Sequence, residues 1–119
     1  MKNAVVTLNG RAVIPSAQIA DSFFTRFAGL MFRKSIPEDY GLIISPCNQI
    51  HMFNMRFAID VIYLTREGEV VHIDRGIKPW RVGKTVRQAF FVIEVPEGAC
   101  EKQGIAEGCR LEITGEEQK

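Results

Sequence analysis

An apolar run at positions 57–64, FAIDVIYL, sets the main requirement for the fold. In an extended chain neither face of this run would be polar except at Asp60, so it predicts a β-strand that is buried on both sides. A buried carboxylate without a partner costs on the order of several kcal/mol or becomes protonated. We therefore expect Asp60 to pair with His51, Arg56 or Arg81. Such a pair would suit a structural link between strands as well as a functional site.

The other strands follow from short apolar runs between turn residues. Runs at 4–8 and 11–14 flank Asn9-Gly10, a favoured two-residue hairpin turn, and Pro15 would end the second run or place it at an edge. Further strands are expected at 41–45, 70–73, 85–95 and 110–114, with a loop at 75–83.

Two helices are expected. The first begins after a cap at Asp21 or Ser22 and continues through Gly29 to Arg33 and Lys34. Its periodicity predicts one apolar face that packs on the core, made of Phe23, Phe27, Leu30 and Met31, with Phe24 and Ala28 beside it. The second helix covers 99–103 and is closed by Gly104.

These elements predict an α+β, mainly β fold. We expect a mostly antiparallel, barrel-like sheet of about seven short strands, with two short helices. The alternating βαβ signals of a doubly wound sheet are absent. At 119 residues the chain fits a single globular domain over 1–114, followed by a polar C-terminal tail at 115–119.

Charge and cysteine usage restrict the partners and the compartment. The net charge is +1, so nucleic acid is not an expected partner, although five cations and no acid fall between 75 and 87. Three cysteines without a CxxC pair fit a reducing compartment. No apolar run is long enough to span a membrane and no signal-peptide h-region is present. We expect a cytoplasmic protein as the chain is given, or an exported one if a leader was trimmed; no oligomeric state is predicted.

Cys47, His51 and Asp60 are the candidates for catalysis. Cys47 and His51 lie four residues apart, and with Asp60 they could form the Cys-His-Asp system of a hydrolase. Against this, free cysteines are usually buried and inert, and four residues of extended chain span roughly 13 Å. A metal site that adds His72 to these three is not predicted, because no known ligand spacing is present, and no cofactor is expected.

A basic loop provides the second candidate feature. Its cations recur every three residues, at 75, 78, 81, 84 and 87, and would line one ridge of an extended chain. Arg81 could hold an anion through two hydrogen bonds, and Trp80 offers a stacking face. Alternatively, the loop is solvated and Trp80 covers the edge of the core.

Many of these residues form a pattern that resembles domain-of-unknown-function family 192. The resemblance covers roughly 20–111 and rests on these groups: Gly29-Leu30-Met31, Pro46-Cys47, Ile50-His51, Met55-Arg56-Phe57, Ile59-Asp60-Val61 and Lys78-Pro79-Trp80-Arg81. The family consists of small uncharacterised prokaryotic proteins, some with export signals. It usually has Thr where this chain has Met52. The resemblance implies one compact β-rich domain in which His51, Asp60 and Trp80 share a feature, and it implies no activity.

Our hypothesis is a small binding domain that holds a polar or anionic ligand, such as a carbohydrate, in a cleft. The cleft would be lined by His51, Asn54, Arg56, Asp60, Trp80 and Arg81. The alternatives are a hydrolase that depends on Cys47, His51 and Asp60, and a structural or protein-interaction module in which the polar cluster only fixes the sheet.

Overall fold

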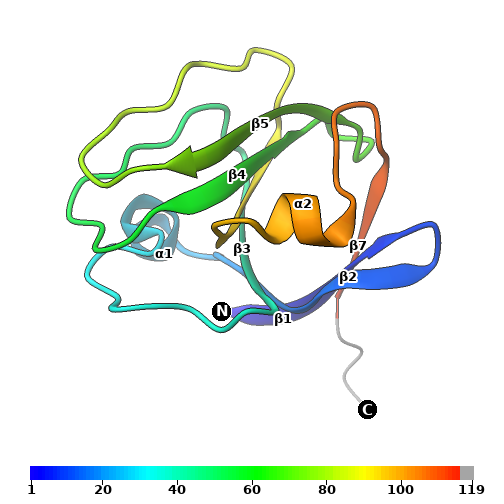
Figure 1. Ribbon diagram of the computed structural model, residues 1–119, viewed down its shortest axis with the longest axis horizontal. Helices are drawn as coiled ribbons and strands as arrows, with labels where there is room; N and C mark the ends of the chain where they lie inside the picture. The colour runs from blue at the N-terminus through cyan, green and yellow to red at the C-terminus, as the bar shows by residue number, and fades with distance from the viewer. Residues whose placement is uncertain (116–119) are drawn as a thin grey trace.

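The computed structural model describes residues 1–115, except for the side chain of Phe23. Over these residues seven strands form one curled sheet, in the order β5-β4-β6-β3-β2-β1-β7 (Figure 1). The strands are β1 (Lys2–Leu8), β2 (Arg11–Ile19), β3 (Tyr40–Ile44), β4 (Ile59–Leu64), β5 (Val70–Ile77), β6 (Phe91–Pro96) and β7 (Leu111–Gly115). The predicted mainly β, barrel-like class with two short helices is confirmed. The sheet is mixed, because β2 and β3 pair in parallel.

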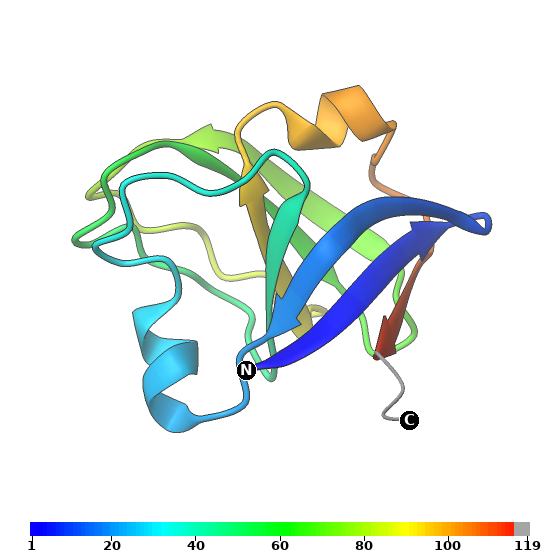
Figure 2. The same cartoon turned by 90° about the horizontal axis from the view of Figure 1, so that it is seen from below.

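The curl brings the two edges of the sheet together at one corner (Figure 2). The N–H of Val70 on β5 donates to the carbonyl of Cys109 just before β7, and the N–H of Leu111 donates to the carbonyl of Gly68, both at 2.8 Å. A Cβ on Gly68 would lie 2.2 Å from the Leu111 carbonyl oxygen, so this approach requires glycine. The result is a half-barrel rather than an open sheet.

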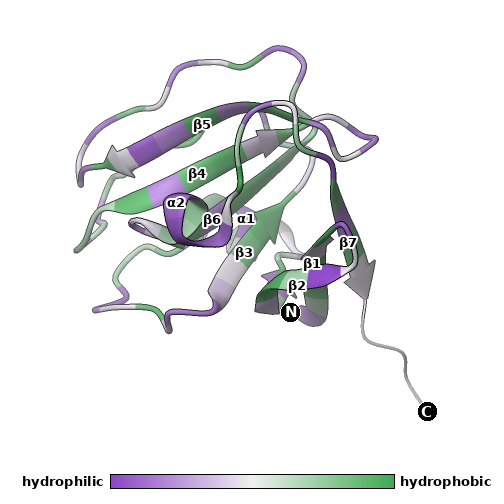
Figure 3. Ribbon diagram, turned by 45° about the vertical axis from the view of Figure 1, so that its right-hand side comes forward, coloured by the Kyte–Doolittle hydropathy of each residue, from purple (hydrophilic) through white to green (hydrophobic). Residues whose placement is uncertain are grey.

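Both faces of the central strands are buried, as the 57–64 run predicts. One apolar cluster contains Ile62 and Leu64 of β4 and packs beneath the second helix, α2 (Ala99–Gln103). The other contains Val61 and Tyr63 and packs against the loop between β3 and β4. Figure 3 accordingly shows apolar residues along most of β4. The two clusters define the two sides of the sheet.

The β1–β2 hairpin is confirmed, with Asn9 and Gly10 at φ 51° and 79°. β2 continues through Pro15 to Ile19, because Pro15 lies where the register between β1 and β2 shifts and its missing N–H is tolerated. The predicted strand at 85–95 is too long: only its end belongs to β6, and 78–90 is a loop. Residues 75–77, predicted as loop, belong to β5.

The first helix, α1 (Phe23–Ala28), is shorter than predicted. Ser22 and Thr25 form a capping box at its start, and Gly29 ends it with φ 51°. The predicted core-packing face is confirmed at Leu30, which is 1% exposed, and is wrong at Phe27, which is 60% exposed; Phe24 beside it is 74% exposed. With only six residues, the helix is too short to lay a continuous stripe on the sheet. α2, in contrast, has the predicted bounds and closes at Gly104.

The predicted polar tail falls almost entirely outside the described residues. Gly115 is the last residue of β7, and 116–119 lie beyond the part that the structure describes. Within that part, no helix has the length and apolar content needed to cross a membrane.

Candidate functional site

Asp60 is 1% exposed, and both of its carboxyl oxygens accept hydrogen bonds from backbone N–H groups. Its Oδ1 accepts the N–H of Gly76 at 2.9 Å, and its Oδ2 accepts those of Gly98 and Cys100 at 3.1 and 3.3 Å. Gly76 lies where the β4–β5 register shifts, which turns its N–H away from the ladder. Gly98 is the N-cap of α2 and has no side chain to cap the helix, so Asp60 supplies that cap.

The predicted side-chain partners of Asp60 are therefore wrong. The reason is that the Asp60 side chain lies on the α2 side of the sheet. Asp60 pairs across strands with Val95, on the side of α2, whereas the neighbouring pair Val61–Glu94 belongs to the opposite side. Cys47 packs with that opposite side. The sheet thus separates Asp60 from Cys47 and His51, and the Cys-His-Asp constellation is not assembled.

A pocket of about 200 Å³ lies on the opposite side of the sheet from Asp60. Its walls come from α1 and the residues after it, from β3, from the β3–β4 loop and from β6. The lining residues are Arg26, Phe27, Ala28, Gly29, Leu30, Ile44, Cys47, Gln49, Ile50, His51, Met55 and Glu94. The pocket therefore combines an apolar lining with a few polar groups from distant parts of the chain, as small-ligand sites do.

Glu94 is the exceptional group in this pocket. It is 4% exposed, and its Oε1 has no hydrogen-bond partner. A Cβ on Gly29 would lie 3.1 Å from that oxygen, so glycine leaves room for the carboxyl group. Burial raises the pKa of Glu94 to about 7, against the opposing effect of the Arg33 charge. Glu94 is not among the residues predicted for the site, although its place in the apolar strand FVIEVP gives the same signal as Asp60 in FAIDVIYL.

His51 does line this pocket. Its Nδ1 accepts the backbone N–H of Phe53 at 3.2 Å, so the neutral ring carries its proton on Nε2 as a donor. The ring lies between Phe27 and Phe53, with centroids 5.7 and 5.0 Å away, and Phe53 in turn lies 6.2 Å from Trp80. Two of the predicted cleft residues, His51 and Trp80, are thus joined through Phe53.

The two loops that carry these rings are fixed to each other by backbone hydrogen bonds. Met52 donates to Arg81, Trp80 to Met52, and Gly83 to Ile50, at 2.7 to 2.9 Å. This irregular ladder, which includes the bridge of His51 with Val82, explains why 78–90 does not join β6 as a long strand. The pocket wall is therefore held by main-chain contacts whose strength does not depend on side-chain identity.

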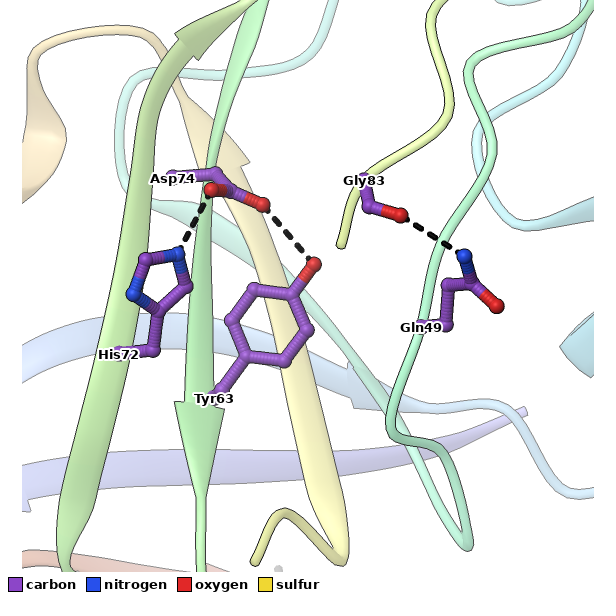
Figure 4. A network of polar contacts seen from close by, with 5 residues as sticks. All are labelled: Gln49, Tyr63, His72, Asp74 and Gly83. Atoms are coloured by element: carbon purple, nitrogen blue, oxygen red, sulfur yellow. Dashed lines mark hydrogen bonds and ion pairs between the residues drawn. The ribbon is translucent and has the colours of Figure 1, made fainter. Parts of the chain in front are cut away.

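Two sets of polar contacts, one between β4 and β5 and one between the two loops, lie where Gly83 approaches Tyr63 (Figure 4). Asp74 accepts the Tyr63 hydroxyl at 3.0 Å and contacts Nε2 of His72 at 2.8 Å, while Gln49 donates to the carbonyl of Gly83 at 2.8 Å. A Cβ on Gly83 would lie 2.9 Å from the Tyr63 oxygen. Burial, with the Asp74 charge, raises the pKa of Tyr63, which keeps its hydroxyl a donor.

The remaining predicted cleft residues lie outside the pocket lining. Arg56 and Arg81 are exposed, and Asn54 has φ 60° and accepts the N–H of Phe32 through its carbonyl. Their roles toward a ligand stay predictions. Among residues 1–115, no three His, Cys, Asp or Glu side chains gather as metal ligands would.

Alkylation of Cys47 is expected to be slow at neutral pH and to accelerate as the pH rises. Burial and the Glu94 charge both raise the pKa of this thiol, so little thiolate is present. Mass spectrometry of iodoacetamide-treated protein would give the rate at Cys47, with Cys100, whose pKa burial raises to about 12, as an internal reference for a buried thiol. Rapid modification of Cys47 below pH 7 would contradict this and restore the thiol-dependent hydrolase.

The family model DUF192, described as an uncharacterized ACR, matches residues 4–113, which confirms the resemblance drawn from the sequence. A UPF0127 protein of Pyrococcus furiosus is 37% identical over 108 residues, covering 87% of this chain and 90% of that protein. A UPF0127 protein of Pyrococcus horikoshii is 40% identical over 86 residues, covering 68% and 72%. A solved structure of a protein of unknown function from Novosphingobium aromaticivorans superposes with a TM-score of 0.80 at 22% identity, covering 92% of this chain and 83% of that one.

Proposed function

This chain belongs to the uncharacterised DUF192 family, and we propose its function from the pocket alone. The protein is a binding domain that takes one small, neutral polyhydroxyl ligand, such as a single sugar residue, between α1 and the sheet. The observation that carries the proposal is the buried Glu94, whose Oε1 has no hydrogen-bond partner beside an otherwise largely apolar pocket.

Glu94 favours a ligand that donates hydrogen bonds. A buried acceptor without a partner costs about 1–3 kcal/mol, which a ligand hydroxyl at Oε1 would recover. With a pKa of about 7 the carboxyl group is present in both forms at neutral pH. A hydroxyl can donate to the carboxylate and accept from the acid, whereas an anion beside Oε1 would be repelled by the carboxylate form. We therefore propose a neutral ligand, whereas the sequence hypothesis allowed a polar or an anionic one.

The rest of the lining suits a ring with polar edges and apolar faces. Arg26 and the Nε2 of His51 can donate to ligand oxygens, and Phe27 and Met55 provide apolar surface. A volume of about 200 Å³ leaves room for one ring of a small polyhydroxyl ligand. In this proposal the carboxyl group in the binding site belongs to Glu94, whereas the sequence hypothesis placed Asp60 there.

Binding is tested by recording ¹H–¹⁵N NMR spectra during titration with a panel of monosaccharides and polyols at neutral pH. We expect shifts confined to residues around Gly29, His51 and Glu94. Glu94→Gln should weaken binding about tenfold or more, because the amide presents one acceptor instead of two. Glu112→Gln, on the exposed part of β7, is the matched control and should bind as the wild type does. Absence of shifts at these residues, or full affinity of Glu94→Gln, would refute the proposal.

A further inference from the structure

Five large aromatic side chains are exposed on one side of the molecule, between 44% and 74% each. They form what we call the aromatic end: Phe24, Phe27, Phe32, Phe53 and Trp80. Ring contacts link Phe27 through His51 and Phe53 to Trp80, and a backbone hydrogen bond joins Phe32 to Asn54, the neighbour of Phe53. Figures 1 and 2 both show α1 and the two loops on the side away from β7. Such a concentration of exposed apolar rings marks an interaction surface.

Backbone strain accompanies two of these rings. Phe32 and Trp80 have φ values of 68° and 69°, in the left-handed region that bulky residues rarely adopt. Strain of this kind persists where the surrounding structure imposes it, and it concentrates at functional positions. Neither ring gains core packing in return, since both are more than 60% exposed. The chain thus holds two apolar rings toward the solvent at a cost to its own stability.

The segments that carry the aromatic end contain charged residues of a single sign. The segments that carry it, 22–34, 45–57 and 78–92, contain eight of the 15 Lys and Arg residues and none of the 14 Asp and Glu residues. The cations are Arg26, Arg33, Lys34, Arg56, Lys78, Arg81, Lys84 and Arg87. The net charge of +1 for the whole chain is therefore divided between basic segments at the aromatic end and an acidic remainder of the sequence.

We propose that the aromatic end docks the protein on a lipid bilayer that contains anionic lipids. Exposed Phe and Trp rings insert at the headgroup level, and surrounding Lys and Arg side chains approach the lipid phosphates. Stable attachment needs both inserted apolar rings and cations near the lipid phosphates, and the aromatic end has both. Single-stranded nucleic acid would need rings arranged along a charged groove, whereas here the most exposed ring, Phe24, projects from a short helix.

Trp80 is the only tryptophan and reports docking directly. We expect its fluorescence to shift to shorter wavelength, and to be quenched by brominated lipid, with vesicles of equal parts phosphatidylcholine and phosphatidylglycerol. Vesicles of phosphatidylcholine alone should produce a much smaller change, and added salt should weaken the effect. Flotation of the protein with the vesicles gives the affinity independently of fluorescence.

Variants separate docking from folding. Phe24→Ser combined with Phe32→Asn should weaken vesicle binding at least about tenfold, through lost apolar insertion. Asn tolerates the left-handed region, so thermal unfolding should show no loss of fold at that position. Lys78→Gln with Arg81→Gln should weaken binding roughly thirtyfold. Lys102→Gln with Arg110→Gln, outside the aromatic end, removes the same charge and should bind as the wild type does.

Three outcomes would overturn the proposal: no fluorescence shift with anionic vesicles, equal binding by the aromatic variant, or equal loss in both charge variants. Binding of a single-stranded oligonucleotide without binding of vesicles would assign the face to nucleic acid instead. The monosaccharide titration and the vesicle assay are separate measurements, so pocket and docking face can each fail alone.

Discussion

Asp60→Asn is expected to lower the free energy of unfolding by about 3 kcal/mol or more. Both carboxylate oxygens are used: one accepts Gly76, the other accepts Gly98 and Cys100. An amide has a single oxygen, so its NH₂ group would face at least one buried N–H donor. The substitution leaves that donor unpaired and weakens the cap of α2, and it also loosens the link between β4 and β5.

Chemical denaturation in urea at pH 7 would measure this change, and thermal unfolding should show a fall in Tm of about 10 °C or more. Asp21→Asn, at an exposed position before α1, is the matched control and should stay within about 0.5 kcal/mol of the wild type. Because Asp60 lies on the opposite side of the sheet from the pocket, folded Asp60→Asn protein should keep its ligand affinity. Unchanged stability would contradict the structural role.

Asp60 also shows what sequence reasoning can and cannot supply. The apolar run around it predicts a strand buried on both faces and a paired carboxylate, and both are observed. The partners are backbone N–H groups at a register shift and at a helix start. Every residue except proline has such a group, so no residue type in the sequence signals these partners. Side-chain candidates such as His51 were the only ones that the sequence could name.

The aromatic residues of α1 illustrate a second limit. Periodicity shows that Phe23, Phe27 and Leu30 would share a helical face, but it does not show whether that face meets the core or the solvent. Gly29 decided the outcome by ending the helix, and the sequence alone allowed it to be read as a tolerated interior glycine. The apolar run at 85–95 shows the same limit: before β6 it forms a loop, in which Val86 donates to the carbonyl of Asn48 and Phe90 to that of Leu64.

The Glu94 carboxylate lowers the free energy of unfolding, whereas that of Asp60 raises it. The pH dependence of the free energy of unfolding should reveal the effect of Glu94. Its pKa is 4.5 in the unfolded chain and about 7 when folded, so between these values the folded state binds more protons. The contribution of Glu94 is therefore most favourable below pH 4.5 and is lost as the pH rises toward 7. The full rise corresponds to about 3 kcal/mol. The buried carboxyl group in the pocket therefore lowers the free energy of unfolding at neutral pH.

Glu94→Gln should remove this dependence. Urea denaturation from pH 4.5 to pH 8 should give a difference between variant and wild type that grows in favour of the variant by up to about 3 kcal/mol. Subtracting the free energy of unfolding of the wild type from that of the variant cancels the contribution of the other carboxyl groups, which titrate in both proteins. Curves that run parallel would contradict a raised pKa at Glu94. A variant that is more stable at pH 8 yet no longer binds a sugar ligand would show that the fold tolerates Glu94 for the sake of binding, whereas it depends on Asp60 for its own stability.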